Sequence, residues 1–253
     1  AGYERGLELG AKILVKLDGD GQMDTAYLPR LIAPILFGEA DYAKGNRFTT
    51  QDHLAQMPRI RTIGNAMLSM AAKISTGYWT IFDPTNGFTA IEASVARLIL
   101  SRSVDRRYFF ETDLLYHLGT VRAVVRDVPI PARYGDEVSN LKIARIVLPF
   151  AAKHLRNTVR RFIGQYFVRD FTVASLESVL GFALIAFGAI YGLVWIGASH
   201  EETAPAGVVM AAALPIIVGV QLLLQAVNYD VLSSPTEPIH TRLLALDDLD
   251  AQA

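Results

Sequence analysis

The sequence contains no cysteine, which excludes disulfide bridges, thiolate metal sites and cysteine nucleophiles together. It has no excess of charge of either sign: the formal net charge is -1, and basic and aromatic residues do not alternate, so we expect no nucleic-acid partner. Only 19% of the 253 residues are charged, whereas 51% are hydrophobic, which is apolar for a soluble protein.

Two stretches contain no Asp, Glu, Lys or Arg, namely residues 178–199 and 203–229. Each is longer than the ~20 residues that a helix needs to cross the hydrocarbon layer of a membrane. A pair of buried helices in a large soluble core is the alternative, but core helices of this length rarely lack a polar face. The sequence therefore predicts two transmembrane helices over residues 173–229, joined as a tight antiparallel hairpin.

The distribution of basic residues predicts the orientation of this hairpin. Five of them lie shortly before the first span: Lys153, Arg156, Arg160, Arg161 and Arg169. The connection between the spans, His200-Glu201-Glu202, carries no Lys or Arg. By the positive-inside rule, residues 1–170 and the tail, residues 230–253, are expected in the cytoplasm of a multi-pass membrane protein.

Residues 143–172 combine apolar residues at near-helical spacing with several basic ones, which is typical of amphipathic helices on an anionic membrane surface. An ordinary amphipathic helix packed on the preceding domain is the alternative. Within the spans, Gly181, Gly188 and Gly192 favour close helix packing, either inside the hairpin or in a homo-oligomer. Both readings of the glycines are left open.

The first 142 residues alternate between strand-like and helix-like segments. Strands are expected at residues 12–17, 40–44, 78–82 and 121–128, and helices at residues 23–37, 60–76 and 91–101. Alternation of this kind indicates an α/β sheet domain over residues 1–142.

An acidic turn follows the first expected strand, with the sequence Asp-Gly-Asp-Gly-Gln at residues 18–22. In a turning backbone Asp18 and Asp20 can approach one hard cation, and oxygen ligands of this kind suit Mg²⁺ or Mn²⁺ bound together with substrate phosphates. Taken alone, two aspartates in a glycine-rich turn are equally compatible with a plain surface turn.

Four further motifs follow the acidic turn in a fixed order: Lys-Gly-Asn-Arg-Phe at 44–48, Asp-Pro-Thr-Asn-Gly-Phe at 83–88, Phe-Glu-Thr-Asp-Leu-Leu at 110–115, and Val-Pro-Ile at 128–130 with Arg133 and Lys142 beyond it. Together they resemble the family 2 glycosyltransferases of the GT-A fold, a Rossmann-like α/β fold. The group they resemble most is the polyprenyl-phosphate sugar transferases related to dolichol-phosphate mannose synthase, in which a C-terminal membrane hairpin is common. The resemblance runs through most of residues 1–145.

This resemblance implies metal-binding and catalytic roles. Asp18 and Asp20 match the family's Asp-x-Asp, and Gln22 would help to hold the metal and the diphosphate. Glu111 and Asp113 match an acidic signature whose last carboxylate acts as general base or orients the acceptor. Alternatively, both acids are simple charges at the start of a helix.

The resemblance also implies contacts to phosphate and acceptor. Arg47 falls in the family's Gly-Ser-Arg segment and would face a phosphate, with a surface salt bridge as its alternative role. Asn86 lies in the stretch near the acceptor and sugar, where Thr89 replaces a usual Arg. Arg133 and Lys142 match a loop that closes over the diphosphate, here lengthened by an insertion.

The resemblance predicts a membrane-bound inverting transferase that moves a hexose from a nucleotide-sugar donor to a polyprenyl-phosphate acceptor. The expected place is the cytoplasmic face of a bacterial-type inner membrane, with the catalytic domain in the cytoplasm. The family's first strand and nucleotide-binding segment have no match before Gly10, so we expect a GT-A domain incomplete at its N-terminus and little activity of these residues alone. A polysaccharide-type enzyme with a glycan acceptor and a catalytically silent membrane scaffold are the alternatives.

Overall fold

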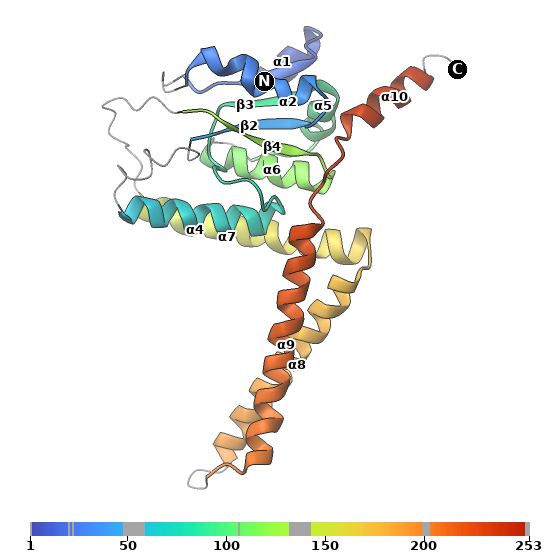
Figure 1. The fold of residues 1–253 in the computed structure, drawn as a ribbon. Helices are drawn as coiled ribbons and strands as arrows, with labels where there is room; N and C mark the ends of the chain where they lie inside the picture. Colours follow the sequence, from blue (N-terminus) through green and yellow to red (C-terminus); the bar gives the residue numbers. More distant parts are fainter. Residues whose placement is uncertain are drawn as a thin grey trace. The chain divides into compact units, whose positions relative to one another are not determined.

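The computed structural model describes residues 2–19, 21, 23–47, 59–105, 107–131, 143–198 and 203–250. The chain divides into two compact units: Ala1–Arg161 with Ser234–Ala253, and Phe162–Ser233. The first is a mixed α/β domain and the second is dominated by two long helices (Figure 1). The predicted α/β class is therefore confirmed, as is the presence of two long apolar helices.

The elements of the first unit follow in chain order. They are α1 (Gly2–Glu8), β1 (Ile13–Lys16), the short 3-10 helix η1 (Thr25–Tyr27), α2 (Leu28–Leu36), β2 (Tyr42–Asn46), α4 (Arg59–Thr76), β3 (Thr89–Glu92), α5 (Ala93–Leu100), η2 (Arg107–Phe109), α6 (Phe110–Thr120), β4 (Val125–Pro129), α7 (Ile143–Ile163, which ends just inside the second unit) and α10 (His240–Asp250). The second unit contains the π-helical turn η3 (Gly164–Arg169), α8 (Val173–Ala198) and α9 (Ala206–Leu232).

The four strands form one sheet in the order β1-β3-β2-β4. Strand β3 is antiparallel to both of its neighbours, whereas β2 and β4 are parallel. The carboxyl ends of β1, β2 and β4 and the amino end of β3 therefore lie at the same edge of the sheet. The residues that directly follow β1, β2 and β4, and those that directly precede β3, therefore lie at that edge.

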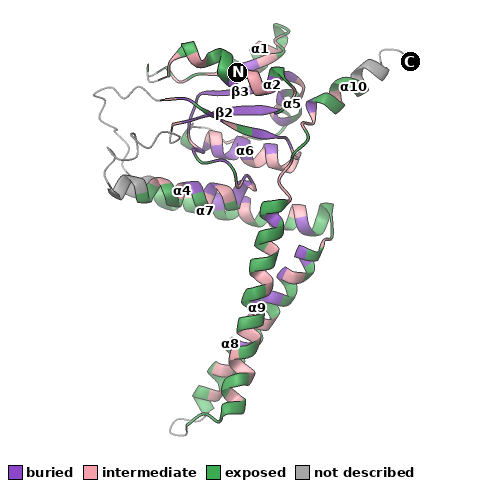
Figure 2. Ribbon diagram, viewed as in Figure 1, coloured by how far each residue is buried: buried purple, intermediate pink, exposed green. Residues whose placement is uncertain are grey.

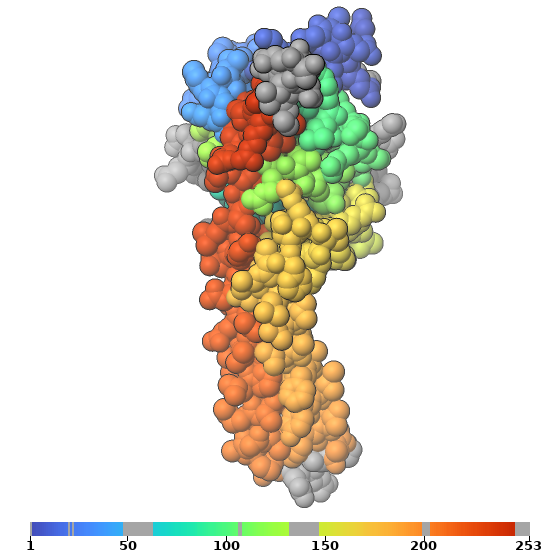
Figure 3. All heavy atoms as spheres, turned by 90° about the vertical axis from the view of Figure 1, so that its right-hand side faces the viewer, coloured from blue at the N-terminus to red at the C-terminus, as the bar shows by residue number. Residues whose placement is uncertain are grey.

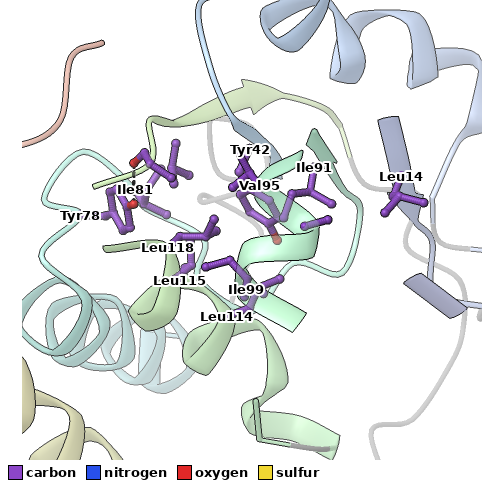
Figure 4. Packing of buried hydrophobic residues seen from close by; sticks show 13 residues of the cluster. Leu14, Tyr42, Tyr78, Ile81, Ile91, Val95, Ile99, Leu114, Leu115 and Leu118 are labelled. Atoms are coloured by element: carbon purple, nitrogen blue, oxygen red, sulfur yellow. Dashed lines mark hydrogen bonds between the residues drawn. The ribbon is translucent and has the colours of Figure 1, made fainter. Parts of the chain in front are cut away.

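Each face of the sheet carries its own apolar core, because successive side chains of a strand point to opposite faces. On one face Leu14, Ile91, Tyr42 and Val125 form a continuous row across the strands and pack against α5 and α6 (Figure 4). On the other face Ala43, Ala90 and Val128 pack against α2. Figure 2 shows the two central strands, β2 and β3, as buried, as expected for the middle of a sheet with helices on both sides.

One predicted element is absent, and another begins later than predicted. Residues 78–82 form no strand: Tyr78 and Ile81 are buried in the core from a turn, and the Tyr78 hydroxyl donates to the carbonyl of Ala123 at 2.6 Å. The predicted helix at residues 91–101 begins later, because Thr89–Glu92 pairs as β3 and Glu92 accepts hydrogen bonds from the backbone of Ser94 and Val95 as the N-cap of α5.

The tail after the second long helix returns to the α/β domain. Asp41, fully buried before β2, accepts from the backbone N–H groups of Ile239 at 3.0 Å and His240 at 2.9 Å, and pairs with His240 Nδ1 at 2.8 Å. Its carboxylate also accepts from Val124 N–H at 2.6 Å, next to β4. The tail is thereby fixed to the centre of the sheet, and α10 packs on α5.

The second unit is a close-packed helical hairpin, in which α8 and α9 lie against one another along their length (Figure 3). Both helices are long and apolar enough to cross a membrane. Gly181 and Gly219 bring the two backbones together: a Cβ at Gly181 would lie 2.9 Å from the Gly219 carbonyl oxygen, and one at Gly188 would lie 2.4 Å from that of Ala212. Gly181, Gly188 and Gly219 therefore allow close packing of the two helices inside the hairpin.

Candidate functional site

Four of the five described residues of the predicted site gather at one edge of the sheet, and Asp113 is the exception. Asp18 follows β1, Arg47 follows β2, and Asn86 lies in the turn that enters β3. Glu111 comes to the same place from the first turn of α6. Motifs that are far apart in the sequence are thus neighbours because the strand directions bring their ends together.

A polar row marks the boundary between the core and this edge. Lys16, Thr89, Lys44 and Asp127 pair in register across all four strands, immediately beyond the row formed by Leu14, Ile91, Tyr42 and Val125. The two rows are two residues apart on each strand, so they share the face that α6 covers. We call the four residues the polar row; the apolar core ends where it begins.

Lys16 joins the two acidic motifs. Its ammonium lies 2.5 Å from Asp18 Oδ1 and 2.9 Å from Glu111 Oε1, a contact between residues 95 positions apart. Burial tends to lower the pKa of Lys16, but the hydrogen bonds to both carboxylates outweigh it and raise the pKa above its ordinary value. The ammonium thus stays charged and holds Asp18 and Glu111 side by side.

The turn at residues 83–88 is held by Lys44 of β2 and by Arg47, the residue that follows β2. Arg47 binds the buried Asp83 through two bonds, Nε to Oδ2 at 2.8 Å and Nη2 to Oδ1 at 3.1 Å. The buried ammonium of Lys44 donates to the backbone carbonyl of Asn86, and Asn86 Oδ1 accepts from Phe88 N–H at 2.9 Å. Arg47 and Asn86 therefore shape this turn in the structure, and their predicted contacts to phosphate and acceptor stay predictions.

Gly87 leaves the space in which the Asp18 side chain lies. A Cβ at this position would be 1.9 Å from Asp18 Oδ2. The turn and the acidic motif are therefore in direct contact, and only a residue without a side chain allows it.

Burial shifts the pKa of two members of the polar row. It lowers the pKa of Lys44 to about 8, against the opposing effect of the carboxylates of Asp83, Glu111 and Asp127. It raises the pKa of Asp127 to about 6, although Asp127 Oδ2 accepts from Phe82 N–H at 2.9 Å and from Asn46 Nδ2 at 2.8 Å. The charges at this edge are thus held partly out of water, where they act more strongly on one another.

Asp113 is oriented differently from Glu111. Its carboxylate accepts from the backbone N–H of Asp105 at 2.7 Å and from Asn157 Nδ2 of α7 at 2.9 Å, and His117 Nε2 lies 3.6 Å away. Burial would raise the pKa of Asp113, but the nearby imidazole of His117 and the hydrogen bonds from Asn157 and Asp105 outweigh it and hold the pKa below its usual range. These contacts tie α6 to α7, and the catalytic role of Asp113 stays a prediction.

Four predicted site residues lie outside the described residues: Asp20, Gln22, Arg133 and Lys142. Within the described part of the chain, no three His, Asp or Glu side chains gather as metal ligands. The proposed donor set of Asp18, Asp20 and Gln22 consists of oxygen ligands, and Asp18 itself is partly exposed at the end of β1, which fits a hard divalent cation held by few protein ligands.

No protein-family model matches the chain. It is 27% identical over 135 residues to UDP-N-acetylglucosamine–dolichyl-phosphate N-acetylglucosaminyltransferase of Methanococcus voltae, over 53% of each chain. It is 28% identical over 131 residues to undecaprenyl-phosphate mannosyltransferase of Micrococcus luteus, covering 51% of this chain and 53% of that one. Polyprenol monophosphomannose synthase of Mycolicibacterium smegmatis is 30% identical over 131 residues, covering 51% and 49%.

The chain resembles the polyprenyl-phosphate sugar transferases. It spans about half the length of these curated relatives. The predicted resemblance is thereby confirmed.

The sequence interpretation missed three charged residues at this edge: Lys16, Lys44 and Asp127. A signal for Lys16 was present, because Lys16 and Asp18 are two positions apart and so project from the same face of a strand. Lys44 and Asp127 could not be assigned in this way, since their place depends on which strands become neighbours. Local sequence patterns do not determine the order of strands in a sheet.

Proposed function

We propose that this protein is a membrane-bound inverting glycosyltransferase that transfers a hexose from a nucleotide sugar to a polyprenyl phosphate on the cytoplasmic face of the membrane. The observation that carries the proposal is the meeting of Asp18, Glu111 and the turn at residues 83–88 at one edge of the sheet. The similarity to polyprenyl-phosphate sugar transferases gives the class of reaction. A family 2 assignment and a GT-A fold are part of the proposal.

In this reaction a phosphate oxygen of the acceptor forms a bond to the anomeric carbon while the bond from that carbon to the nucleotide diphosphate breaks. Asp18, Asp20 and Gln22 would hold Mg²⁺ or Mn²⁺, which supplies positive charge to the departing diphosphate. Lys16 binds Asp18 Oδ1 and would keep this carboxylate in place for the ion. Arg133 and Lys142, which follow β4 in the sequence, are proposed to contact the same diphosphate.

Glu111 is the carboxylate that we expect to orient the acceptor. The carboxylates of Glu111 and Asp18 both bind the ammonium of Lys16. The oxygens of Asp113 instead accept hydrogen bonds from the backbone of Asp105 and the side chain of Asn157. A phosphate acceptor is already ionised near neutral pH, so it needs little deprotonation. Asp113 then acts as a positioning residue, which fixes the first turn of α6 and with it Glu111.

Exposed apolar side chains on two helices of the α/β domain support a membrane surface as a partner. On α4 an exposed apolar stripe follows helical spacing: Ile63, Met67, Met70 and Ile74. On α7 Leu148, Leu155 and Val159 are exposed in the same manner. Residues 143–172 were predicted to lie on the membrane, and α4 adds a second helix with an unburied apolar stripe.

The test is sugar transfer into butanol-extractable lipid, with the full reading frame expressed in membranes. Radiolabelled UDP-glucose, UDP-N-acetylglucosamine and GDP-mannose are each offered with Mg²⁺, with Mn²⁺ and with a chelator. Asp18→Asn and Glu111→Gln are compared with Glu39→Gln, a change at an exposed carboxylate outside the site.

We expect metal-dependent lipid label from one donor, lost in Asp18→Asn, reduced at least about tenfold in Glu111→Gln and unchanged in Glu39→Gln. Label in a polymer instead of lipid would contradict the proposed acceptor. Absence of transfer from every donor would contradict the enzyme itself and favour a silent scaffold.

A further inference from the structure

An amide side chain without a partner lies near the middle of α9. Gln221 is two residues from Gly219, the midpoint of Ala206–Leu232, which is about 3 Å along the helix axis. Its side chain is exposed, and no described residue hydrogen-bonds it. If α9 crosses a membrane, as its length and composition allow, this amide lies deep in hydrocarbon, where an unpaired polar group is costly.

Neither water nor a lipid head group can satisfy Gln221 from this position. The charge-free span ends at Tyr229, about 12 Å away along the axis. A glutamine side chain reaches only about 5 Å, far less than the long side chains that snorkel to the interface. Gln225, exposed one turn further along α9, carries a second amide, but the two amides can satisfy only part of each other's donors and acceptors. A further partner must therefore approach within the membrane.

Gln221 does not face the partner helix α8. The residues of α9 that contact the glycines of α8 are Ala212, Ile216, Gly219 and Leu223. Gln221 is two residues from Gly219, nearly opposite on a helix with 3.6 residues per turn. The hairpin itself therefore leaves this face of α9 uncovered.

The uncovered face is broad, and one stripe of it passes through Gln221. Exposed residues recur at alternating steps of four and three: Met210, Leu214, Ile217, Gln221, Leu224 and Asn228. This is the spacing at which two helices pack along a seam, and Gln221 and Asn228 occupy the same position in consecutive heptads. We call these six residues the α9 seam.

We propose that the α9 seam binds the α9 seam of a second copy of this chain in the membrane, with the two Gln221 amides paired. Two copies inserted in the same orientation bring their α9 helices together in parallel, so that each residue of the seam meets its own equivalent. An amide both donates and accepts hydrogen bonds, and it is therefore complementary to itself. The apolar residues above and below Gln221 pack the remainder of the seam.

The chain has no cysteine, so single cysteines can report the contact without further changes. Ile217→Cys and Leu224→Cys lie on the seam, on either side of Gln221. Leu180→Cys is the matched control: it is exposed on α8 at the depth of Gln221, since its neighbour Gly181 packs on Gly219. Each full chain is oxidised in membranes with copper phenanthroline, and the dimer is measured on non-reducing gels.

We expect dimer from both seam cysteines at a yield at least about fivefold above Leu180→Cys. In the Ile217→Cys chain, Gln221→Leu should lower the yield several-fold, whereas Gln221→Asn should retain most of it. Gln221→Leu changes an outward-facing residue and leaves the packing of α8 on α9 intact. Equal cross-linking at the seam and the control, no cross-linking at the seam, or an unchanged yield with Gln221→Leu would each overturn the proposal.

Discussion

At the scale of single residues, Gly87 controls the position of Asp18. In Gly87→Ala the new methyl group would collide with the Asp18 carboxylate, which must then leave its place beside Lys16. We expect lipid-linked sugar transfer to fall at least about tenfold, because small displacements of positioning groups have large effects on rate. The melting temperature should change little, since the displaced group is partly exposed.

Gly64→Ala is the control for this prediction. Gly64 lies in α4, and a Cβ there meets no atom within 4 Å. Transfer by Gly87→Ala at the wild-type rate would show that the contact between the turn and Asp18 has no role in the reaction.

Asp127 gives the folded state a pH dependence whose sign follows from its raised pKa of about 6. Between about pH 4 and 6 the folded chain binds this proton more tightly than the unfolded chain, so stability falls as the pH rises through this window. Asp127→Asn removes the charge while it keeps an oxygen acceptor for Phe82 and Asn46.

At pH 7 we expect Asp127→Asn to be more stable than wild type by about 1 kcal/mol, with the difference vanishing below about pH 4. Thermal unfolding in detergent over pH 4 to 8 measures this, with Glu39→Gln as the surface control. A difference that stays constant over the whole range would rule out ionisation of Asp127 as its cause.

At the scale of elements, the contact between α8 and α9 depends on glycine. Gly188→Val would place a side chain where the Ala212 carbonyl oxygen lies, so the helices must separate. Gly197→Val, in the same helix, meets nothing within 4 Å. We expect Gly188→Val to lower the melting temperature in detergent clearly and Gly197→Val to leave it nearly unchanged; equal effects would mean that helix propensity, not packing, governs both.

The elements that the sequence could predict are those with a strong local pattern. The charge-free runs located α8 and α9, and residues 12–17 and 60–76 nearly coincide with β1 and α4. Strand β3 was missed because it has only four residues and leads directly into α5, so that Ala90 and Ile91 fit the helical pattern equally well. Residues 78–82 have the composition of a strand, but Gly77 adopts a φ of 83° and turns the chain into the core.

The candidate site shows the same limit. Asp18, Glu111 and the turn at residues 83–88 could be named from their motifs, but the bridge between two of them, Lys16, depends on how α6 lies on the sheet. The opposite orientations of Glu111 and Asp113 likewise depend on α7, which supplies Asn157. Local patterns identify such residues as candidates, and tertiary packing decides which of them point to the site.

At the scale of the whole molecule, Asp41 ties the tail to the α/β domain. Asp41→Ala leaves the buried N–H groups of Val124 and His240 without an acceptor, which we expect to cost about 3 kcal/mol of stability. The tail should also detach more often, so that trypsin cleaves at the exposed Arg242 faster than in wild type or in Glu39→Ala. Mass spectrometry of the released peptide measures this, and unchanged protection of Arg242 would contradict the role of Asp41.

The return of the tail sets an order of events during biosynthesis. Asp41 is synthesised early, but Ile239 and His240 leave the ribosome only after all of α8 and α9. The first unit therefore cannot reach its final structure during translation until both apolar helices have been synthesised. Folding of the sheet domain is therefore completed late, after the residues of the hairpin have been synthesised.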